Sequence, residues 1–179
     1  RTRGGERMTI SAESFDFVAD LVRRRSGIVL EQGKEYLVEG RLQPLARAAA
    51  AADVDAYVRA LRTTPRLGDL EAVVDALTTN ETSWFRDAEP FRALVEHVVP
   101  DLGGRLRIWS AACSTGQEPY SIAMALADVA QPGGVRILGT DLSPSVLDRA
   151  REGRYSQLEI NRGLPAAMLV RHFRRVGAD

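Results

Sequence analysis

Apolar residues recur every three or four positions through roughly the first hundred residues, the spacing of helices that bury one face. The first such run consists of Phe15, Val18, Leu21 and Val22. The same spacing predicts successive amphipathic helices, which begin near Ser11, Lys34, Asp53 or Asp55, Leu70 and Asp87. No alternating, strand-like pattern interrupts them, so this part of the chain is predicted to be helical throughout.

Capping and helix-breaking residues divide this helical part. Ser11 is a typical N-cap, because its hydroxyl can accept a bond from a free amide of the first turn. Gly27 is expected to end the first helix in the left-handed conformation. Pro44 is expected to kink or break the second helix near residues 40–43, since proline removes a helical hydrogen bond and costs about 3 kcal/mol. Pro100 is expected to stop the last helix of the series.

The pattern changes after these helices. Residues 106–112 form a predominantly apolar run typical of a buried strand. Residues 113–119 then form a turn of small residues, and a helix is predicted at 120–129. After two glycines, residues 135–140 predict a second strand, which is followed directly by Asp141.

This order of elements is typical of half of a nucleotide-binding βαβ domain: a strand, a glycine-bearing turn, a helix and a second strand that ends in an acid. The acid can accept hydrogen bonds from ribose hydroxyls. The turn has one glycine, Gly116, so it does not match the dinucleotide motif, whose pyrophosphate needs more bare backbone. The nucleoside of S-adenosylmethionine (SAM) carries no phosphate. This favours a methyltransferase, while a dehydrogenase remains a candidate.

Two further helices are predicted beyond Asp141. Ser143 and Pro144 read as an N-cap followed by proline at the first helical position, and residues 165–173 predict a short final helix. Only two parallel strands are therefore predicted, and such a sheet is not a stable unit in water. We expect later strands of the sheet to lie outside this sequence, and the alternative is a partner chain that completes it.

The composition of the chain argues against several other classes of function. With 24 basic and 24 acidic residues the formal net charge is zero, which does not indicate nucleic-acid binding or attraction to an anionic membrane. No apolar run approaches the roughly 20 residues needed to cross a bilayer. The single cysteine, Cys113, fits a reducing cytoplasm, and a small side chain in a tight turn explains it better than a nucleophile does. His97 and His172 are far apart in the sequence, so no metal site is expected.

Two longer motifs carry a family resemblance. Residues 78–87 read TTNETSWFRD, and residues 109–121 read WSAACSTGQEPYS. Together with the GTD sequence at 139–141, they resemble the CheR-type chemotaxis receptor methyltransferases. The first motif is similar to the N-E-T-x-F-F-R linker of that family, with Trp84 in place of the first Phe. The second is similar to its S-T-G-E-E-P-Y-S cofactor loop, with Gln117 in place of the first acid.

The resemblance implies a fold, an activity and a partner. Members of this family use SAM to esterify glutamates on the cytoplasmic helical bundle of chemoreceptors, which leaves S-adenosylhomocysteine (SAH). The implied class is α/β, with a small all-helical N-terminal subdomain and linker at residues 8–86. The first half of a Rossmann-like methyltransferase domain follows at 87–179, with its later strands absent. The implied location is the cytoplasm. Alternatives are a non-catalytic cofactor-binding or interaction module of the same fold and, more distantly, an NAD-dependent oxidoreductase.

The resemblance also implies the site residues. The cofactor contacts that it implies are Asn80, Thr82, Arg86, Ala111, Gly116, Glu118 and Asp141. Asp141 is expected to bind the ribose hydroxyls, although it could instead cap the next helix. Glu118 is expected to meet the methionyl amine of the cofactor, although a carboxylate there also favours the helix dipole. Arg86, the candidate catalytic residue, would bind the cofactor carboxylate or orient the incoming glutamate. A salt bridge to Asp87 or Glu89 is its alternative.

Overall fold

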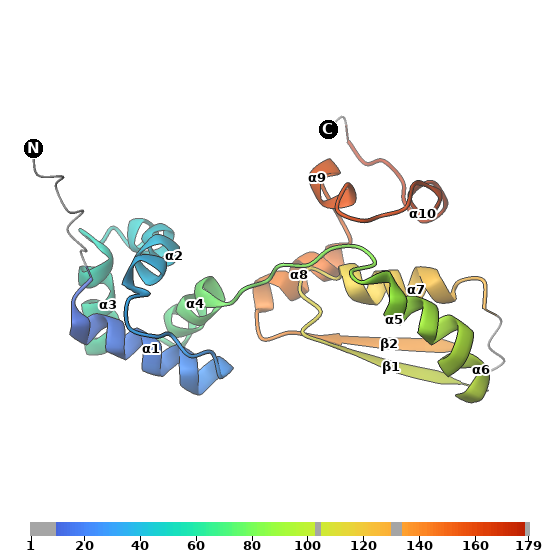
Figure 1. The fold of residues 1–179 in the computed structure, drawn as a ribbon. Helices are drawn as coiled ribbons and strands as arrows, with labels where there is room; N and C mark the ends of the chain where they lie inside the picture. Colours follow the sequence, from blue (N-terminus) through green and yellow to red (C-terminus); the bar gives the residue numbers. More distant parts are fainter. Residues whose placement is uncertain (1–9, 103–104, 130–133, 178–179) are drawn as a thin grey trace, which may run out of the picture. The chain divides into compact units, whose positions relative to one another are not determined.

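The computed structural model describes residues 10–102, 105–129 and 134–177 (Figure 1). The chain divides into two compact units, residues 1–79 and 80–179. The sequence placed this division after residue 86, at the end of the expected linker. Residues 80–86 group with the second unit because Trp84 is buried there, with its indole edge-on to the rings of Tyr155 and Phe173.

The first unit is a set of helices whose apolar faces meet in one core. In its described residues these helices are α1 (Ala12–Ser26), α2 (Glu35–Ala48), α3 (Val54–Thr63) and α4 (Leu67–Leu77). Each of them contributes a completely buried side chain to a single cluster, through Val18, Leu42, Val58 and Val73 respectively. Residues 10–98, all of which are described, contain no strand, as the helical periodicity predicted.

The helix ends of the first unit follow the capping residues in the sequence. The Ser11 hydroxyl accepts a bond from the Ser14 backbone N–H at 3.3 Å. The Asp53 carboxylate accepts one from the Ala56 N–H at 2.7 Å. Gly27 follows α1 with a φ of 75°, in the left-handed region that glycine enters without strain. These predicted caps are confirmed.

Asp55 connects α3 to the start of α1. One carboxylate oxygen accepts bonds from the backbone N–H and the hydroxyl of Ser11, at 3.0 and 2.6 Å. The other oxygen pairs with Arg59 at 3.0 Å. These bonds, with the one from the Ser11 hydroxyl as the largest cause, lower the pKa of Asp55 to about 2. A side chain from one helix therefore fixes the N-cap of another.

The predicted break in the second helix is wrong, because α2 runs without interruption through Pro44. Pro44 cannot donate a bond to the carbonyl of Gly40, one turn earlier. Both residues are exposed, so water can bond that carbonyl. On the buried side of the helix, Val38 and Leu42 pack into the core and hold α2 in place.

A parallel pair of strands forms the sheet of the second unit. β1 (Leu106–Ala111) and β2 (Val135–Thr140) pair along their whole length, with Leu106 opposite Val135 and Ala111 opposite Thr140. Both strands were predicted, and β1 ends one residue earlier than expected. The helices described in this unit are α5 (Ala88–Ala93), the π-helical turn η1 (Leu94–Val98), α6 (Val99–Leu102), α7 (Gln117–Leu126), α8 (Pro144–Glu152), α9 (Gln157–Ile160) and α10 (Ala166–His172).

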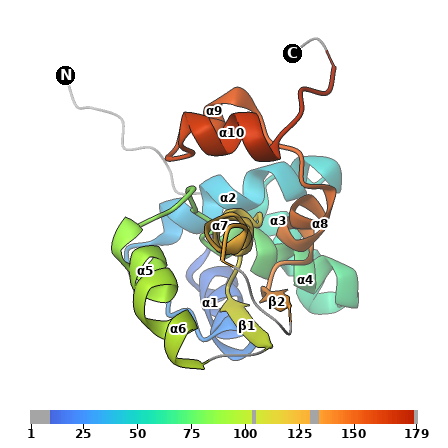
Figure 2. The same ribbon diagram turned by 90° about the vertical axis from the view of Figure 1, so that its right-hand side faces the viewer.

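Helix α7 lies between the strands and the segment that contains α9 and α10 (Figures 1 and 2). On the strand side, Ile122 and Leu126 pack with Leu106 of β1. On the other side, Met124 packs with Ile160 of α9. The helix that follows the β1 turn is therefore held from both sides.

The helix after Asp87 departs from its prediction. Asp87 is at the N-cap position, but its side chain makes no capping bond and its backbone is left-handed, with a φ of 55°. The helix does not stop at Pro100 but continues to Leu102. A π-helical turn precedes this proline, and the helix continues although Pro100 has no N–H to donate. Within this helix Val99 is buried, whereas Val98 is 43% exposed.

The end of the chain contains one predicted cap and one helix that was not predicted. Ser143 caps α8 by accepting a bond from the Val146 N–H at 3.3 Å, as expected. The short helix α9 begins with a capping box formed by Ser156 and Glu159. A helix this short has no hydrophobic period to detect. Among the described residues, no helix is long and apolar enough to span a membrane.

One face of the sheet is largely open in the described part of the chain. Trp109 is 69% exposed and Leu138 is 59% exposed, and the two are neighbours in the strand register. The Trp109 indole N–H donates to the Thr140 hydroxyl at 2.9 Å. Parallel strands usually have both faces covered, so this apolar face is unusual for a sheet of this kind.

Candidate cofactor site

The turn between β1 and α7 has an unusual backbone. Ala112 and Ser114 have φ values of 59° and 50°, and Gly116 has a φ of 96°. A left-handed conformation costs a residue with a side chain about 1–2 kcal/mol, so this turn persists only if neighbouring groups hold it. The first of these groups is the end of β2, where the Thr140 carbonyl accepts a bond from the Cys113 N–H at 2.9 Å.

Cys113 fills the space between this turn and β2. Its side chain is buried, and its Sγ would lie 3.0 Å from a Cβ atom added at Gly139. Burial, reinforced by the nearby Asp141 carboxylate, raises the pKa of the Cys113 thiol. A buried, protonated thiol is a packing residue and not a nucleophile, which agrees with its interpretation in the sequence.

Asp141 joins the turn to the start of α8. One carboxylate oxygen accepts a bond from the Ser114 N–H at 2.8 Å, and the other accepts one from the Ser143 N–H at 3.0 Å. Ser143, and not Asp141, caps α8. A carboxylate has about four lone-pair sites, so two remain for ribose hydroxyls. Asp141 thus combines a role in shaping the turn with acceptor capacity for a ligand.

The segment 80–86 lies against the same turn. The Asn80 carbonyl accepts a bond from the Ser114 hydroxyl at 2.7 Å. The Phe85 N–H donates to the Ser121 hydroxyl of α7 at 3.0 Å. These contacts bring the two motifs of the sequence together. Thr82 is half-buried within the segment, and Ala111 is exposed at the end of β1.

Gly116 has a structural role in the turn, in addition to the cofactor contact expected of it. Its N–H already donates to the Cys113 carbonyl at 3.0 Å. A Cβ atom at this position would lie 3.0 Å from the Ala150 Cβ and 3.0 Å from the Tyr155 hydroxyl. The missing side chain therefore makes room for α8 and for Tyr155, and in this structure Gly116 shapes the turn. Gln117, where the family motif has an acid, is buried and accepts a bond from the Thr115 hydroxyl at 2.7 Å.

Arg86 and Glu118 line one cavity of about 440 Å³. Glu118 is in the first turn of α7 and accepts a bond from the Ser110 hydroxyl at 2.7 Å. Among the described residues, the ion-pair partner of Glu89 is Arg92, and Arg86 forms no ion pair. The salt-bridge alternative for Arg86 is therefore not observed. One guanidinium, that of Arg86, and two carboxylates, those of Asp87 and Glu118, therefore line the same cavity.

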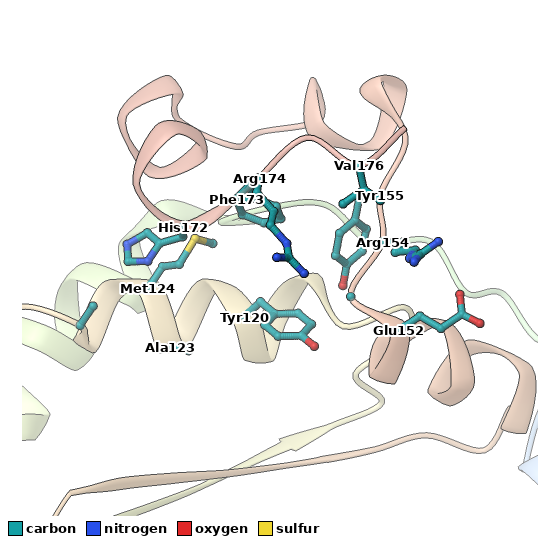
Figure 3. Close-up of a pocket in the computed structure, with 12 residues that line it drawn as sticks. Tyr120, Ala123, Met124, Glu152, Arg154, Tyr155, His172, Phe173, Arg174 and Val176 are labelled. Carbon is teal, nitrogen blue, oxygen red and sulfur yellow. The ribbon is translucent and has the colours of Figure 1, made fainter. Parts of the chain in front are cut away.

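A larger cavity, of about 580 Å³, contains none of the predicted site residues. It is lined by α7, the segment after α8 and the end of α10, including Tyr120, Met124, Tyr155 and Phe173 (Figure 3). Residues 153–155 were expected only to end the helix that begins at Pro144, and no site role was expected for residues 153–164. The described residues contain no group of three or more His, Cys, Asp or Glu side chains that could hold a metal ion.

The parallel strand pair, the turn that follows β1 and the acid after β2 define a Rossmann-like cofactor-binding domain in its first half. Comparison with known families agrees. The family model described as "CheR methyltransferase, SAM binding domain" matches residues 80–179. The model described as "CheR methyltransferase, all-alpha domain" matches residues 13–78. This chain belongs to the CheR methyltransferase family.

Individual relatives support the same assignment. The chain is 42% identical to chemotaxis protein methyltransferase 1 of Pseudomonas aeruginosa, over 93% of this chain and 64% of that protein. It is 42% identical to chemotaxis protein methyltransferase 1 of Vibrio cholerae, over 88% of this chain and 60% of that protein. It is 38% identical to the chemotaxis protein methyltransferase of Escherichia coli, over 95% of this chain and 59% of that protein. The chain spans about three fifths of the length of these relatives.

Proposed function

We propose that this chain supplies the first part of a SAM-dependent protein-glutamate O-methyltransferase that acts on the cytoplasmic helices of chemoreceptors. The names of the relatives support methyl transfer and a place in chemotaxis. The description of the matched family domain supports SAM as the cofactor. The cytoplasm is the proposed location, because the receptor glutamates would be presented there.

The observation that carries this proposal is the shared cavity of Arg86 and Glu118. The methionyl end of SAM has a carboxylate and an ammonium group. A guanidinium binds a carboxylate through two parallel bonds, and a carboxylate side chain complements an ammonium. The cavity is lined by one cationic side chain, Arg86, and two anionic ones, Asp87 and Glu118, so it offers a partner for each charge of this ligand. Asp141, with acceptor capacity left, would bind the ribose.

The turn between β1 and α7 is poorly suited to bind a dinucleotide. A pyrophosphate is bound mainly by free backbone N–H groups. In this turn the Ser114 N–H is bonded to Asp141, and the Gly116 N–H is bonded to Cys113. These amides are already used, whereas a ligand without phosphate does not require them.

The chemistry needs no general base from this chain. A glutamate side chain has a pKa of about 4.3, so it is ionised at neutral pH and is already a nucleophile. When bound, SAM would supply a methyl group that is attached to a positively charged sulfur. The glutamate oxygen would take this methyl group, while the carbon–sulfur bond breaks and its electron pair returns to sulfur. Arg86 would hold the cofactor carboxylate or the incoming glutamate in line for this displacement.

Calorimetric titrations with SAH and with NAD test the proposed ligand. We expect SAH to bind and NAD to show no binding at the same concentrations. Transfer of a labelled methyl group to a chemoreceptor cytoplasmic fragment, by the longer protein that contains this chain, tests the reaction. The label should be released as methanol by mild base, as expected for an ester. NAD binding without SAH binding would overturn the proposal, and SAH binding without methyl transfer would leave a non-catalytic module.

A further inference from the structure

Tyr155 contacts both motifs of the candidate site, although it belongs to neither. It lies just after α8, in a stretch that was expected only to end that helix. Its hydroxyl donates to the Thr115 carbonyl, in the middle of the β1 turn, at 2.7 Å. Its ring packs edge-on against Trp84, with 4.8 Å between centroids. Figure 3 shows the ring standing over α7, with the hydroxyl pointing down towards the level of Tyr120 in the first part of that helix.

The space around Gly116 supports a close fit between Tyr155 and the turn. A Cβ atom at Gly116 would come within 3.0 Å of the Tyr155 hydroxyl. This hydroxyl therefore occupies the room that the glycine leaves and bonds the neighbouring carbonyl. Burial raises the pKa of Tyr155, with the nearby Tyr120 as a smaller cause. The hydroxyl consequently keeps its proton and remains a donor at physiological pH.

The turn needs such a support because of its backbone. Asp141 holds the Ser114 N–H, and the Asn80 carbonyl holds the Ser114 hydroxyl. Those two bonds act on the same residue of the turn. The bond from Tyr155 acts on Thr115, the next residue, which lies between the left-handed Ser114 and Gly116. Loss of this bond would leave Thr115 with only the local bond from its hydroxyl to Gln117 and no hydrogen bond to the segment after α8.

We propose that Tyr155 is a positioning residue for the cofactor site, which sets the β1 turn against the segment 80–86. The inference rests on the proposed function, because the ligand whose binding it serves is the proposed one. Tyr155 does not act on the cofactor directly. Its hydroxyl fixes Thr115, and its ring fixes Trp84, two residues before Arg86. The two motifs are thereby kept in one relative arrangement.

Tyr155→Phe tests this inference, with Tyr120→Phe as the matched control. Both substitutions remove a tyrosine hydroxyl from the same part of the unit and keep the ring. The Tyr120 hydroxyl, however, donates to the Ala150 carbonyl of α8, at 2.9 Å, and not to the turn. We expect Tyr155→Phe to weaken SAH binding about three- to tenfold, as for one lost hydrogen bond, and Tyr120→Phe to leave it within about twofold.

Amide hydrogen exchange in the absence of ligand gives a second measurement. The amides of Ser114 and Gly116 should exchange faster in Tyr155→Phe than in the wild type or in Tyr120→Phe, with similar unfolding midpoints for both variants. Equal SAH affinities and equal exchange for the two variants would overturn the inference. If the wild type did not bind SAH, the proposed function would fail, while the exchange rates would still decide the role of Tyr155 in the turn.

Discussion

The first unit buries the apolar faces of its helices in one core, whereas the second unit leaves apolar strand residues exposed and holds its key turn through polar bonds. Leu42 of α2 is completely buried, while Leu138 of β2 is 59% exposed. The second unit divides its buried apolar residues between two smaller clusters, one on each side of α7. In the described residues, one apolar core holds the first unit, whereas the second unit combines two smaller apolar clusters with hydrogen bonds around a strained turn.

A matched pair of leucine truncations would test this comparison most strongly. Leu42→Ala should destabilise the protein by about 2–5 kcal/mol, because it leaves a cavity in a closed core. Leu138→Ala should change the free energy of unfolding by less than about 0.5 kcal/mol, because the side chain is already largely solvated. Urea unfolding followed by circular dichroism gives both values. A loss of similar size at Leu138 would mean that this face of the sheet is covered in solution.

A pair of glycine substitutions separates backbone strain from close packing. Gly163 has a φ of +99°, and a Cβ atom there would lie 2.3 Å from the Trp84 carbonyl oxygen. Gly33 of the first unit has a φ of +87°, with nothing within 4 Å of the added atom. Gly163→Ala should cost about 2–4 kcal/mol, from strain and overpacking together, and Gly33→Ala about 1–2 kcal/mol from strain alone. Thermal unfolding measures both, and equal losses would show that the Trp84 backbone moves aside freely.

Substitution of Asp141 tests the hydrogen bonds around the turn of the second unit. Asp141→Asn keeps the shape of the side chain but turns one acceptor oxygen into a donor. We expect SAH binding to weaken by about 1.5–3 kcal/mol, which is about ten- to a hundredfold. Asp148→Asn is the control, since Asp148 is exposed on α8 and pairs only with Arg151 among the described residues. Unchanged SAH affinity in a well-folded Asp141→Asn protein would remove Asp141 from the ligand site.

The Asp55 network predicts a pH dependence for the first unit. The folded-state pKa of about 2 lies below the unfolded value of about 3.9, so the network stabilises the folded state fully above pH 4. This contribution, on the order of 1–2 kcal/mol, is lost as the pH falls through 2. Urea midpoints between pH 6 and pH 2 should fall more steeply for the wild type than for Asp55→Asn. Asp16→Asn, an exposed change on α1, should behave like the wild type, and parallel curves for all three proteins would contradict the prediction.

The smallest expected effect concerns Trp84, where the family motif has Phe. The Trp84 Nε1 atom is buried and has no hydrogen-bond partner among the described residues. Trp84→Phe removes this unsatisfied donor, worth about 1–3 kcal/mol, but also loses apolar contact area. We expect the two effects to cancel within about 1 kcal/mol in chemical denaturation. A loss as large as that of Leu42→Ala would show that the indole shape itself is needed.

The sequence alone predicted most of the helices, both strands and the family of the chain. The caps at Ser11, Gly27 and Ser143, both strands and the position of Asp141 are correct in the structure. These features depend on residues that are close in the sequence, such as a hydroxyl three residues before the amide that it caps. Family motifs, which are also local in the sequence, were sufficient to indicate the cofactor class.

Several features could not be predicted in this way because they depend on distant residues. The continuity of α2 through Pro44 reflects which side of the helix meets the core. The role of Gly116 and the bond from Tyr155 to Thr115 join segments some forty residues apart, and no period or motif in the sequence marks that contact. Short-range rules specify helices, strands and caps, since backbone bonds are made between near neighbours. The arrangement that holds a strained turn in place depends on side chains brought together by the packing of α7 against α8 and α9.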